Sequence, residues 1–210
     1  MTLFRRYLKK LKPKLIAIVG GSGAGKTWLA DRLQKIFGKQ AMRISLDNFY
    51  RDRSHLAQKM RRSVNFDHPR AIDWREVERV LGECADGKTT FMPEYDFATH
   101  TRSKKLKSVK PKQFMILDGL WLLRRPAVRR LFFYRVFIDC PQKTCLQRRI
   151  RRDRVERGRD HASVRQQFFQ QVVPMHERFV SSQKRWAHIV MNRPGQKEVR
   201  FLAKQLLKTN

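Results

Sequence analysis

Residues 14–27 of this 210-residue chain read KLIAIVGGSGAGKT. The stretch begins with a β-branched apolar run that ends in glycine, which is typical of a strand buried on both faces of a sheet. Residues 20–27 fit the pattern G-x-x-x-x-G-K-[ST]. Apolar residues then recur at helical spacing up to Gly38, so the pattern stands between a predicted strand and a predicted helix. That position predicts a phosphate-binding P-loop.

Each residue type in such a loop has a physical task. Glycines allow backbone N–H groups to wrap a phosphate, and the helix N-terminus adds its dipole. We expect Lys26 to contact the β- and γ-phosphates of ATP and Thr27 to offer its hydroxyl to Mg²⁺. The predicted ATP-binding residues are Gly20, Gly21, Ser22, Gly23, Ala24, Gly25, Lys26 and Thr27.

Beyond this loop, short apolar strands alternate with amphipathic helices. Strands are predicted at residues 42–46, 114–117, 134–138 and 188–191, and helices at residues 73–84, 141–157, 162–181 and 196–207. The alternation predicts an α/β fold of the three-layer P-loop NTPase type, with a mainly parallel five-stranded sheet and helices on both faces. We expect one domain over residues 14–210, after a basic leader of residues 1–13. It would carry a β-hairpin flap at about residues 89–112 and an arginine-rich lid helix at about residues 141–160.

Composition limits the possible classes of protein. Hydrophobic residues make up 41% of the chain and charged residues 31%, which favours a packed globular domain. No apolar run approaches the roughly 18 residues of a membrane span. Cys84, Cys140 and Cys145 form no C-x-x-C pair, so we expect buried free thiols in a reducing cytoplasm.

The net charge of +30, from 48 Lys and Arg against 18 Asp and Glu, needs its own explanation. An ATP site uses only a few basic groups, so ATP binding accounts for only a small part of this positive charge. Two interpretations stay open: a solvated basic surface, and a surface that binds polyanions. We expect no membrane partner and no specific nucleic-acid partner, although an RNA-binding protein with a nucleotide-switch fold is an alternative function.

A P-loop alone does not distinguish kinases from GTPases or motor ATPases. Asp47 follows the second predicted strand, beside the expected γ-phosphate. A carboxylate there can accept the proton of an attacking hydroxyl, a role that typically contributes roughly 10²- to 10⁴-fold in rate. The alternative is that Asp47 caps the turn that follows it.

Four further segments carry a resemblance to a known family. They are residues 45–51 (SLDNFYR), 65–69 (NFDHP), 94–102 (EYDFATHTR) and 156–160 (ERGRD). In order and spacing they resemble the uridine kinase (uridine–cytidine kinase) family, within the wider phosphoribulokinase and uridine kinase group. The resemblance covers nearly all of the chain. It implies ATP-dependent phosphorylation of the 5′-hydroxyl of uridine or cytidine with Mg²⁺, for pyrimidine salvage, by a homo-oligomer.

The resemblance also implies roles for single residues. Asp47 matches the catalytic base, while Lys26 and the lid arginine Arg152 match groups that meet the phosphates. Mg²⁺ would be held by Thr27, Asp47 and, through water, Asp118. The positions that match nucleoside-binding residues are Tyr50, Asp67, Tyr95, Phe97, His100, Arg149, Arg159 and Gln167.

Independent of the family, Arg149 and Arg152 are three residues apart, so both project from one helix face. For the neighbouring Arg148, Arg151 and Arg154 we expect solvation.

Three positions depart from the family pattern. Asp118-Gly119 stands where Glu-Gly is common, Arg70 stands where an acidic residue is usual, and Arg193-Pro194-Gly195 replaces a Pro-Arg-Gly order near the presumed adenine side. Other acceptors therefore stay open: nicotinamide riboside, a sugar phosphate or a pantothenate-like alcohol. The two aromatic residues and the histidine in residues 95–100 favour a flat ring over a sugar phosphate.

Overall fold

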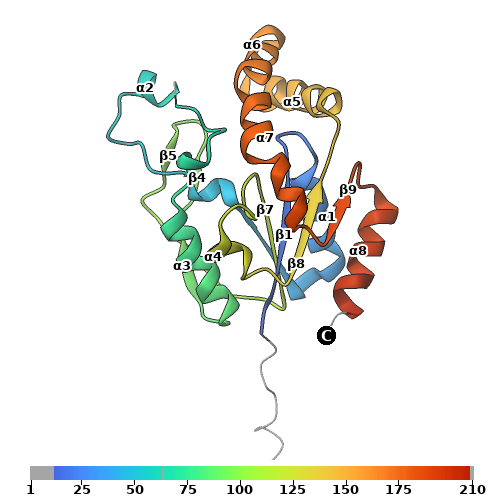
Figure 1. Cartoon of the computed structure of the whole chain (residues 1–210). Coiled ribbons are helices and arrows are strands. Elements are labelled where there is room, and N and C mark those ends of the chain that lie inside the picture. Colours follow the sequence, from blue (N-terminus) through green and yellow to red (C-terminus); the bar gives the residue numbers. More distant parts are fainter. Residues whose placement is uncertain (1–11, 63, 209–210) are drawn as a thin grey trace, which may run out of the picture.

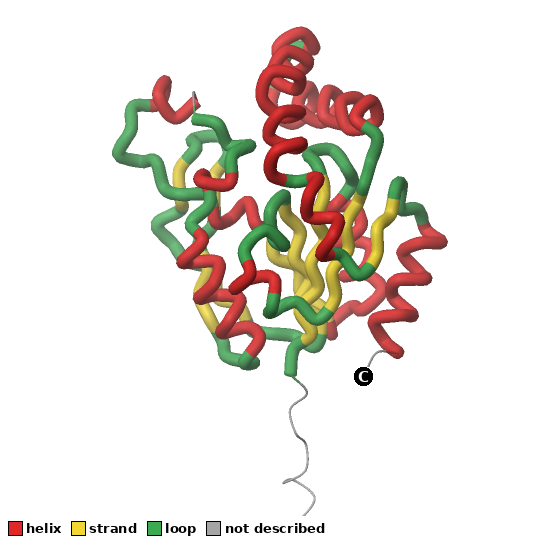
Figure 2. Tube along the Cα trace, viewed as in Figure 1, coloured by secondary structure: helices red, strands yellow, loops and turns green. Residues whose placement is uncertain are grey.

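The structure is a computed structural model that describes residues 12–62 and 64–208. At its centre lies a five-stranded parallel sheet in the order β2-β7-β1-β8-β9 (Figure 2). The predicted α/β fold with its parallel five-stranded sheet is confirmed. Of the predicted leader, residues 1–11 lie outside the described residues. The strands are β1 (Lys14–Gly20), β2 (Ala41–Ser45), β7 (Phe114–Gly119), β8 (Tyr134–Ile138) and β9 (Ile189–Met191).

Helices cover both faces of the sheet (Figure 1). On one face Ile16 and Ile18 of β1 pack with α1 (Lys26–Phe37) and α8 (Gln196–Lys208). On the other face the alternate residues of β1 pack with α3 (Trp74–Ala85) and α4 (Pro126–Arg129). Successive side chains of a strand point to opposite faces, so a strand covered on both sides reads as an uninterrupted apolar run.

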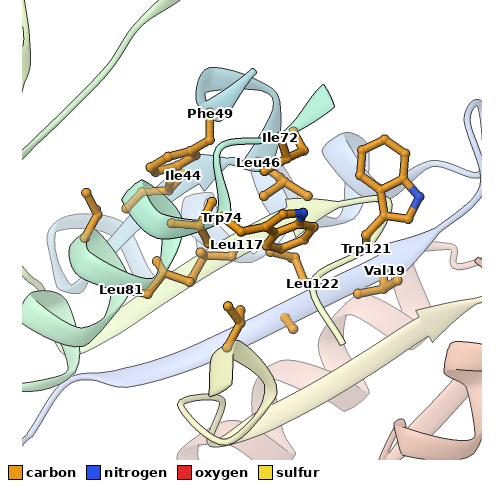
Figure 3. Packing of buried hydrophobic residues seen from close by; sticks show 14 of the residues in the cluster. Val19, Ile44, Leu46, Phe49, Ile72, Trp74, Leu81, Leu117, Trp121 and Leu122 are labelled. Carbon is orange, nitrogen blue, oxygen red and sulfur yellow. The ribbon is translucent and has the colours of Figure 1, made fainter. Parts of the chain in front are cut away.

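The second of these two cores is centred on Trp121, which follows β7 and is fully buried. Figure 3 shows Trp121 beside Val19 of β1 and Leu122, with Leu46 and Ile72 across from it. Residues at the carboxyl ends of β1, β2 and β7 are thereby held by one tightly packed cluster. This edge of the sheet is where ligands bind in open α/β folds.

The lid and its flanks are helical. They comprise α5 (Gln142–Arg157), α6 (His161–Gln167), a π-helical turn η5 (Phe168–Val172) and α7 (Val173–Phe179). The single helix predicted at residues 162–181 is therefore interrupted by a π-turn directly before Pro174. Proline cannot donate a backbone hydrogen bond, and single π-turns are a common way to accommodate a break in the helical ladder.

The flap region holds two small antiparallel ladders. One pairs β3 (Thr90–Met92) with β6 (Lys107–Val109), and the other pairs β4 (Tyr95–Asp96) with β5 (Thr101–Arg102). The sequence pattern missed several short elements, which have too few residues to show a period. These are α2 (Gln58–Arg62) and α4, with the 3₁₀ helices η2 (Gly38–Gln40), η3 (Leu46–Phe49), η4 (Pro69–Ala71) and η6 (Ser181–Trp186).

Within the described part of the chain, no helix combines the length and the apolar character that crossing a membrane requires. All three cysteines carry free thiols, as predicted: Cys84 and Cys145 are buried, and Cys140 is partly buried.

Candidate active site

The P-loop, residues 20–27, connects β1 to α1 and packs against α5. Gly23 has a φ of 82°, and a Cβ atom there would lie 2.5 Å from the carbonyl oxygen of Cys145 in α5. Only glycine permits this backbone conformation together with such close packing. Lys26 begins α1, and its Nζ donates to the carbonyl oxygen of Gly21 at 2.8 Å. The loop amides and the N-terminus of α1 thus form a cradle of the kind that binds phosphate.

Thr27 and Asp118, two of the predicted magnesium-site residues, are in contact. The Thr27 hydroxyl donates to Oδ2 of Asp118 at 2.9 Å. Sheet register explains the approach, because Asp118 of β7 lies opposite Ile18 of β1 and Ser45 of β2. Asp118 is 3% exposed, so few other groups can reach its carboxylate.

Arg43 of β2 also binds Asp118, which the sequence analysis did not anticipate. Its Nε donates to Oδ1 of Asp118 at 2.8 Å, and its Nη1 donates to Asp31 at 3.0 Å. The sequence feature that could have predicted this contact is a basic residue in the middle of the otherwise apolar strand β2. Asp118 thus accepts a hydrogen bond on each of its two carboxylate oxygens.

Asp47 lies close enough to Lys26 for their charges to interact. Burial lowers the pKa of Lys26, and the negative charges of Asp47 and then Asp118 oppose that shift. Ser45 is the N-cap of η3, and its hydroxyl accepts from the backbone N–H of Asp47 at 3.3 Å. The turn that contains Asp47 is therefore capped at its start by Ser45.

The residues predicted to hold a nucleoside base form one aromatic cluster. Tyr95 lies 5.2 Å from Tyr50 and 5.3 Å from Phe97 between ring centroids. Phe66, to which the sequence analysis assigned no role, stacks on His100 with centroids 4.8 Å apart and ring planes at 18°. Tyr50 also donates its hydroxyl to the carbonyl oxygen of Phe66 at 3.1 Å. The cluster joins η3, the loop before η4 and the flap.

Within this cluster Tyr95 has an unusual environment. Its hydroxyl is buried and has no hydrogen-bond partner in the described part of the chain. Burial raises the pKa of Tyr95 to about 12, so its phenol stays protonated at neutral pH. An unpaired buried donor is costly and therefore uncommon in folded proteins. Such a group is a candidate for contact with a ligand.

Arg149 of α5 joins the P-loop to the acceptor-side residues. It is 5% exposed, its Nη1 donates to the Ser22 hydroxyl at 2.8 Å, and its Nη2 donates to Oε1 of Gln167 at 3.0 Å. The same Nη1 lies 4.0 Å from Oδ1 of Asp67. One guanidinium thus contacts three predicted site residues that come from separate segments of the chain.

Asp153, which the sequence analysis overlooked, is fully buried beneath three predicted site arginines. Its carboxylate lies 2.7 Å from Arg152, 3.5 Å from Arg149 and 3.8 Å from Arg159. The role of Asp153 could have been predicted from its sequence position, because it is an acidic residue four positions after Arg149 in a strongly basic helix. Arg159 also donates to Oε1 of Gln167, so one connected network orients all three arginines.

Arg148 is exposed, as expected, but it also contacts the P-loop. Its Nη1 donates to the carbonyl oxygen of Ala24 at 3.0 Å, which ties α5 to the P-loop. The exposed Arg151 and Arg154 agree with the predicted solvation.

A cavity of about 760 Å³ lies between the start of α5, β9 with the loop after it, and α8. Pro141, Met191, Asn192 and Arg193 are among its lining residues. Arg193 donates to the hydroxyl of Thr144 at 3.0 Å, so the loop after β9 is anchored to the start of α5. The loop after β9 therefore borders a space large enough for a purine.

Comparison with known proteins gives a consistent assignment. The model of the phosphoribulokinase / uridine kinase family matches residues 15–200. Uridine kinase of Alkaliphilus metalliredigens is 39% identical over 189 residues, which cover 90% of this chain and 91% of that protein. Uridine kinase of Deinococcus deserti is 36% identical over 189 residues, with coverages of 90% and 91%.

Solved structures share the fold at lower identity. A putative fructose transport system kinase from Silicibacter sp. TM1040 has a TM-score of 0.64 and 19% identity, covering 87% of this chain and 91% of that one. Phosphoribulokinase from Rhodobacter spheroides has a TM-score of 0.61 and 16% identity, with coverages of 84% and 68%. The family match extends from the first core strand into the last helix, and so the chain belongs to the phosphoribulokinase / uridine kinase family.

Proposed function

We propose that this protein transfers the γ-phosphate of ATP to the 5′-hydroxyl of a pyrimidine nucleoside, uridine or cytidine, in pyrimidine salvage. The observation that carries the proposal is the position of Arg149, which contacts Ser22 of the P-loop while lying 4.0 Å from Asp67 on the acceptor side. A group held between these two segments would lie next to both the donor phosphates and a carboxylate that could bind ribose hydroxyls. The curated relatives named uridine kinase support the same acceptor.

On the donor side, the loop amides of residues 20–27 and Lys26 would bind the phosphates of ATP, and the cavity beside β9 would take its purine. Arg152 would meet the transferred group from the lid. Arginine suits this position because its planar fork donates two parallel hydrogen bonds to phosphate oxygens. Phosphoryl transfer asks the protein mainly for such positioning and charge stabilisation.

The residues at the carboxyl ends of β1, β2 and β7 fit Mg²⁺. Because the Thr27 hydroxyl donates a hydrogen bond to Asp118, the lone pairs on its oxygen remain available to a cation. Thr27 and Asp47 would hold the ion, and Asp118 would act through water. No cluster of three or more His, Cys, Asp or Glu that could hold a metal occurs among the described residues. A magnesium ion does not need such a cluster, because phosphate oxygens and water molecules complete its coordination shell. Bound Mg²⁺ supplies charge neutralisation at the β- and γ-phosphates.

On the acceptor side, the aromatic cluster would hold the pyrimidine ring. Tyr50, Tyr95, Phe97 and His100 would line the base. The ribose would meet Asp67 and Arg149, with Arg159 and Gln167 supporting them through the network described above. Asp47 would accept the proton of the 5′-hydroxyl as that oxygen attacks the γ-phosphate.

A panel of acceptors tests this function. ADP release should be measured with uridine, cytidine, nicotinamide riboside, a sugar phosphate and pantothenate, each with ATP and Mg²⁺. We expect turnover with uridine or cytidine to exceed that with the other acceptors. Release of ADP only with a non-nucleoside alcohol would replace the proposed acceptor while keeping the reaction type.

Three further points are part of the proposal. Residues 14–210 would act as one kinase domain with a flap at about residues 89–112 and a lid at about residues 141–160. The protein would work as a homo-oligomer, which light scattering of the purified chain measures directly. Its three free thiols favour a reducing compartment, the cytoplasm.

A further inference from the structure

One group of arginines lies outside the residues assigned to the proposed kinase site. Six arginines form a surface in two groups, one around Phe179 and one around Trp186; they come from η4, the segment before α4, the end of α4, the end of α7, η6 and the start of β8. We name this surface the basic stripe. Its members are Arg70, Arg124, Arg129, Arg135, Arg178 and Arg185.

The first half of the basic stripe surrounds Phe179 at the end of α7. The guanidinium carbon of Arg124 lies 4.7 Å from the Phe179 ring centroid, and that of Arg178 lies 5.1 Å from it. The ring of His68 meets the same phenylalanine edge-on at 4.8 Å. Arg70 follows two residues after His68 and adds its charge to the same group. Phe179 itself is buried, so it fixes the two guanidinium groups at the surface.

The second half surrounds Trp186 at the end of η6. Arg129 of α4 and Arg185 lie 4.1 Å and 4.3 Å from the Trp186 ring. Arg135 lies beside them, with its Nη2 atom 2.6 Å from Nε2 of His188. The Nε atom of Arg135 is buried and has no hydrogen-bond partner in the part of the chain that the structure describes.

Carboxylates do not neutralise the basic stripe. Within residues 12–62 and 64–208, none of its six arginines forms a salt bridge, whereas nearby Arg125 pairs with Glu78 at 3.1 Å and Lys184 pairs with Asp139 at 2.5 Å. Nearby positive charges contribute to the lowered pKa values of two side chains, Arg129 and His68. Burial and then Arg135, Arg130 and Arg185 lower the pKa of Arg129. Burial and then Arg70, Arg178 and Arg124 lower the pKa of His68.

Repulsion of this sort opposes folding, and a bound anion would remove it. We propose that the basic stripe binds the phosphodiester backbone of a nucleic-acid strand, at a site distinct from the ATP and acceptor sites. The proposal goes beyond the kinase function and does not depend on it.

The extended shape of the basic stripe favours a strand over a single phosphate. It begins near His68, on the acceptor-side loop, and reaches Arg135 at the amino end of β8, opposite Ala17 of β1. Figure 1 shows α4 and the segment after α7 on the same side of the sheet, in front of β8. A single small anion would contact only one end of this surface. Successive phosphates along a strand can each accept hydrogen bonds from a different guanidinium group.

The composition of the surface also favours nucleic acid over a lipid membrane. None of the large, exposed hydrophobic side chains of the described residues belongs to the basic stripe. A membrane surface would be expected to gain from such side chains by inserting them between lipids. Because guanidinium groups cover the rings of Phe179 and Trp186, the surface would contact the backbone rather than stack bases. Binding should therefore be independent of sequence.

Fluorescence anisotropy with a labelled oligouridylate of about 20 nucleotides tests the proposal on the full-length protein. Six phosphate contacts predict a slope of log affinity against log salt of about −4 for a single strand. The variant Arg129→Gln/Arg135→Gln/Arg185→Gln should reduce that slope by about 2 and weaken binding about 10- to 100-fold at moderate salt. Phosphoryl transfer by this variant should stay unchanged.

The matched control is Arg32→Gln/Arg165→Gln/Arg200→Gln, which removes the same charge elsewhere. Two of its arginines also contact aromatic rings, Trp28 and Phe169. This control should bind the strand as the unmodified protein does. Equal losses in both triple variants would mean that net charge alone attracts the strand, and the proposal would be wrong.

Two further measurements keep the test decisive. Saturating amounts of a non-hydrolysable ATP analogue and uridine should leave strand binding intact, and displacement would place the strand in the kinase site instead. Photo-crosslinking with 4-thiouridine should label residues 178–188 in the unmodified protein even if the triple variant fails to fold. Labelling confined to other segments, or binding to anionic vesicles without binding to RNA, would overturn the proposal.

Discussion

At the scale of single residues, the proposed chemistry depends on one carboxylate. Asp47 lies where its charge interacts with Lys26, and it follows the end of β2. Ser45 provides the N-cap of η3 and accepts a hydrogen bond from the backbone N–H of Asp47. A base in this position would act on the acceptor hydroxyl without contributing to the binding of the ATP phosphates by the loop amides.

We predict that Asp47→Asn lowers kcat by about 10²- to 10⁴-fold, the usual range for the loss of a positioned base. The dissociation constant for ATP, measured by calorimetry without acceptor, should change little. Turnover close to that of the unmodified protein would remove Asp47 from its role.

The buried hydroxyl of Tyr95 supports a second prediction at this scale. Because the phenol has no partner within the described residues, Tyr95→Phe should not weaken the unliganded protein, and urea unfolding should show equal or greater stability. If the hydroxyl instead donates to the nucleoside, its loss costs about 1 kcal/mol of binding, or roughly a 5-fold rise in KM for the nucleoside.

Tyr134→Phe is the control for that variant. Tyr134 begins β8, and its ring contacts His188, away from the aromatic cluster. Its hydroxyl should not affect KM for the nucleoside. An unchanged nucleoside KM in Tyr95→Phe would exclude Tyr95 as a donor to the acceptor.

At the scale of elements, α5 is organised by the buried carboxylate of Asp153. Helix α5 carries Arg149 and Arg152, and Arg159 follows just beyond its end; each lies within 4.0 Å of Asp153. Without this carboxylate, three positive charges would remain close together in a partly buried region. The helix would then lose both its anchor and the alignment of its arginines.

Asp153→Asn should therefore lower the free energy of unfolding by about 3 kcal/mol, the lower end of the range for breaking a buried ion pair. Chemical denaturation measures this loss. KM for the nucleoside should rise as well, because Arg149 and Arg159 also hold Gln167.

The matched control is Asp86→Asn, an exposed acid that pairs with Lys88 at 3.1 Å. Exposed pairs contribute about 1 kcal/mol or less. Similar losses of stability in the two variants would show that Asp153 contributes no more than a surface ion pair.

At the scale of the whole molecule, the charge of +30 makes acidification unfavourable. Burial, followed by nearby cations, lowers the pKa of His68, His176 and His188. These rings are then neutral in the folded protein at a pH where unfolded histidine, with a pKa of about 6.5, already binds protons. The contribution of these histidines to the free energy of unfolding is therefore fully present above about pH 6.5, and it is lost as the pH is lowered below that value.

His176 gives the clearest test, because its ring is packed over Gly21 in the P-loop. Between about pH 7.5 and pH 5.5, urea unfolding should show a smaller loss of stability in His176→Gln than in the unmodified protein. The exposed His55 serves as control, and His55→Gln should follow the unmodified protein. Identical pH profiles for all three proteins would contradict the prediction.

Local patterns in the sequence were sufficient for the fold class and for part of the site. The P-loop could be found from residues 14–27 alone, because a buried strand, a glycine-rich turn and a helix start follow one another directly. Strand β8 was predicted with its observed bounds, since an apolar run shows its period within a few residues. The π-turn before Pro174 was missed because its hydrogen bonding changes without any change in the apolar pattern.

What the sequence by itself determined was the phosphate cradle, the alternation of strands and helices, and the family to which the chain belongs. Only the tertiary structure decided which distant side chains meet: Arg149 with Ser22, which is 127 residues away, Arg43 with Asp118, and Asp153 with its three arginines. The physical reason is that periodicity and turn chemistry act over a few neighbouring residues. Contacts between segments depend on strand order and register, which place β7 between β2 and β1.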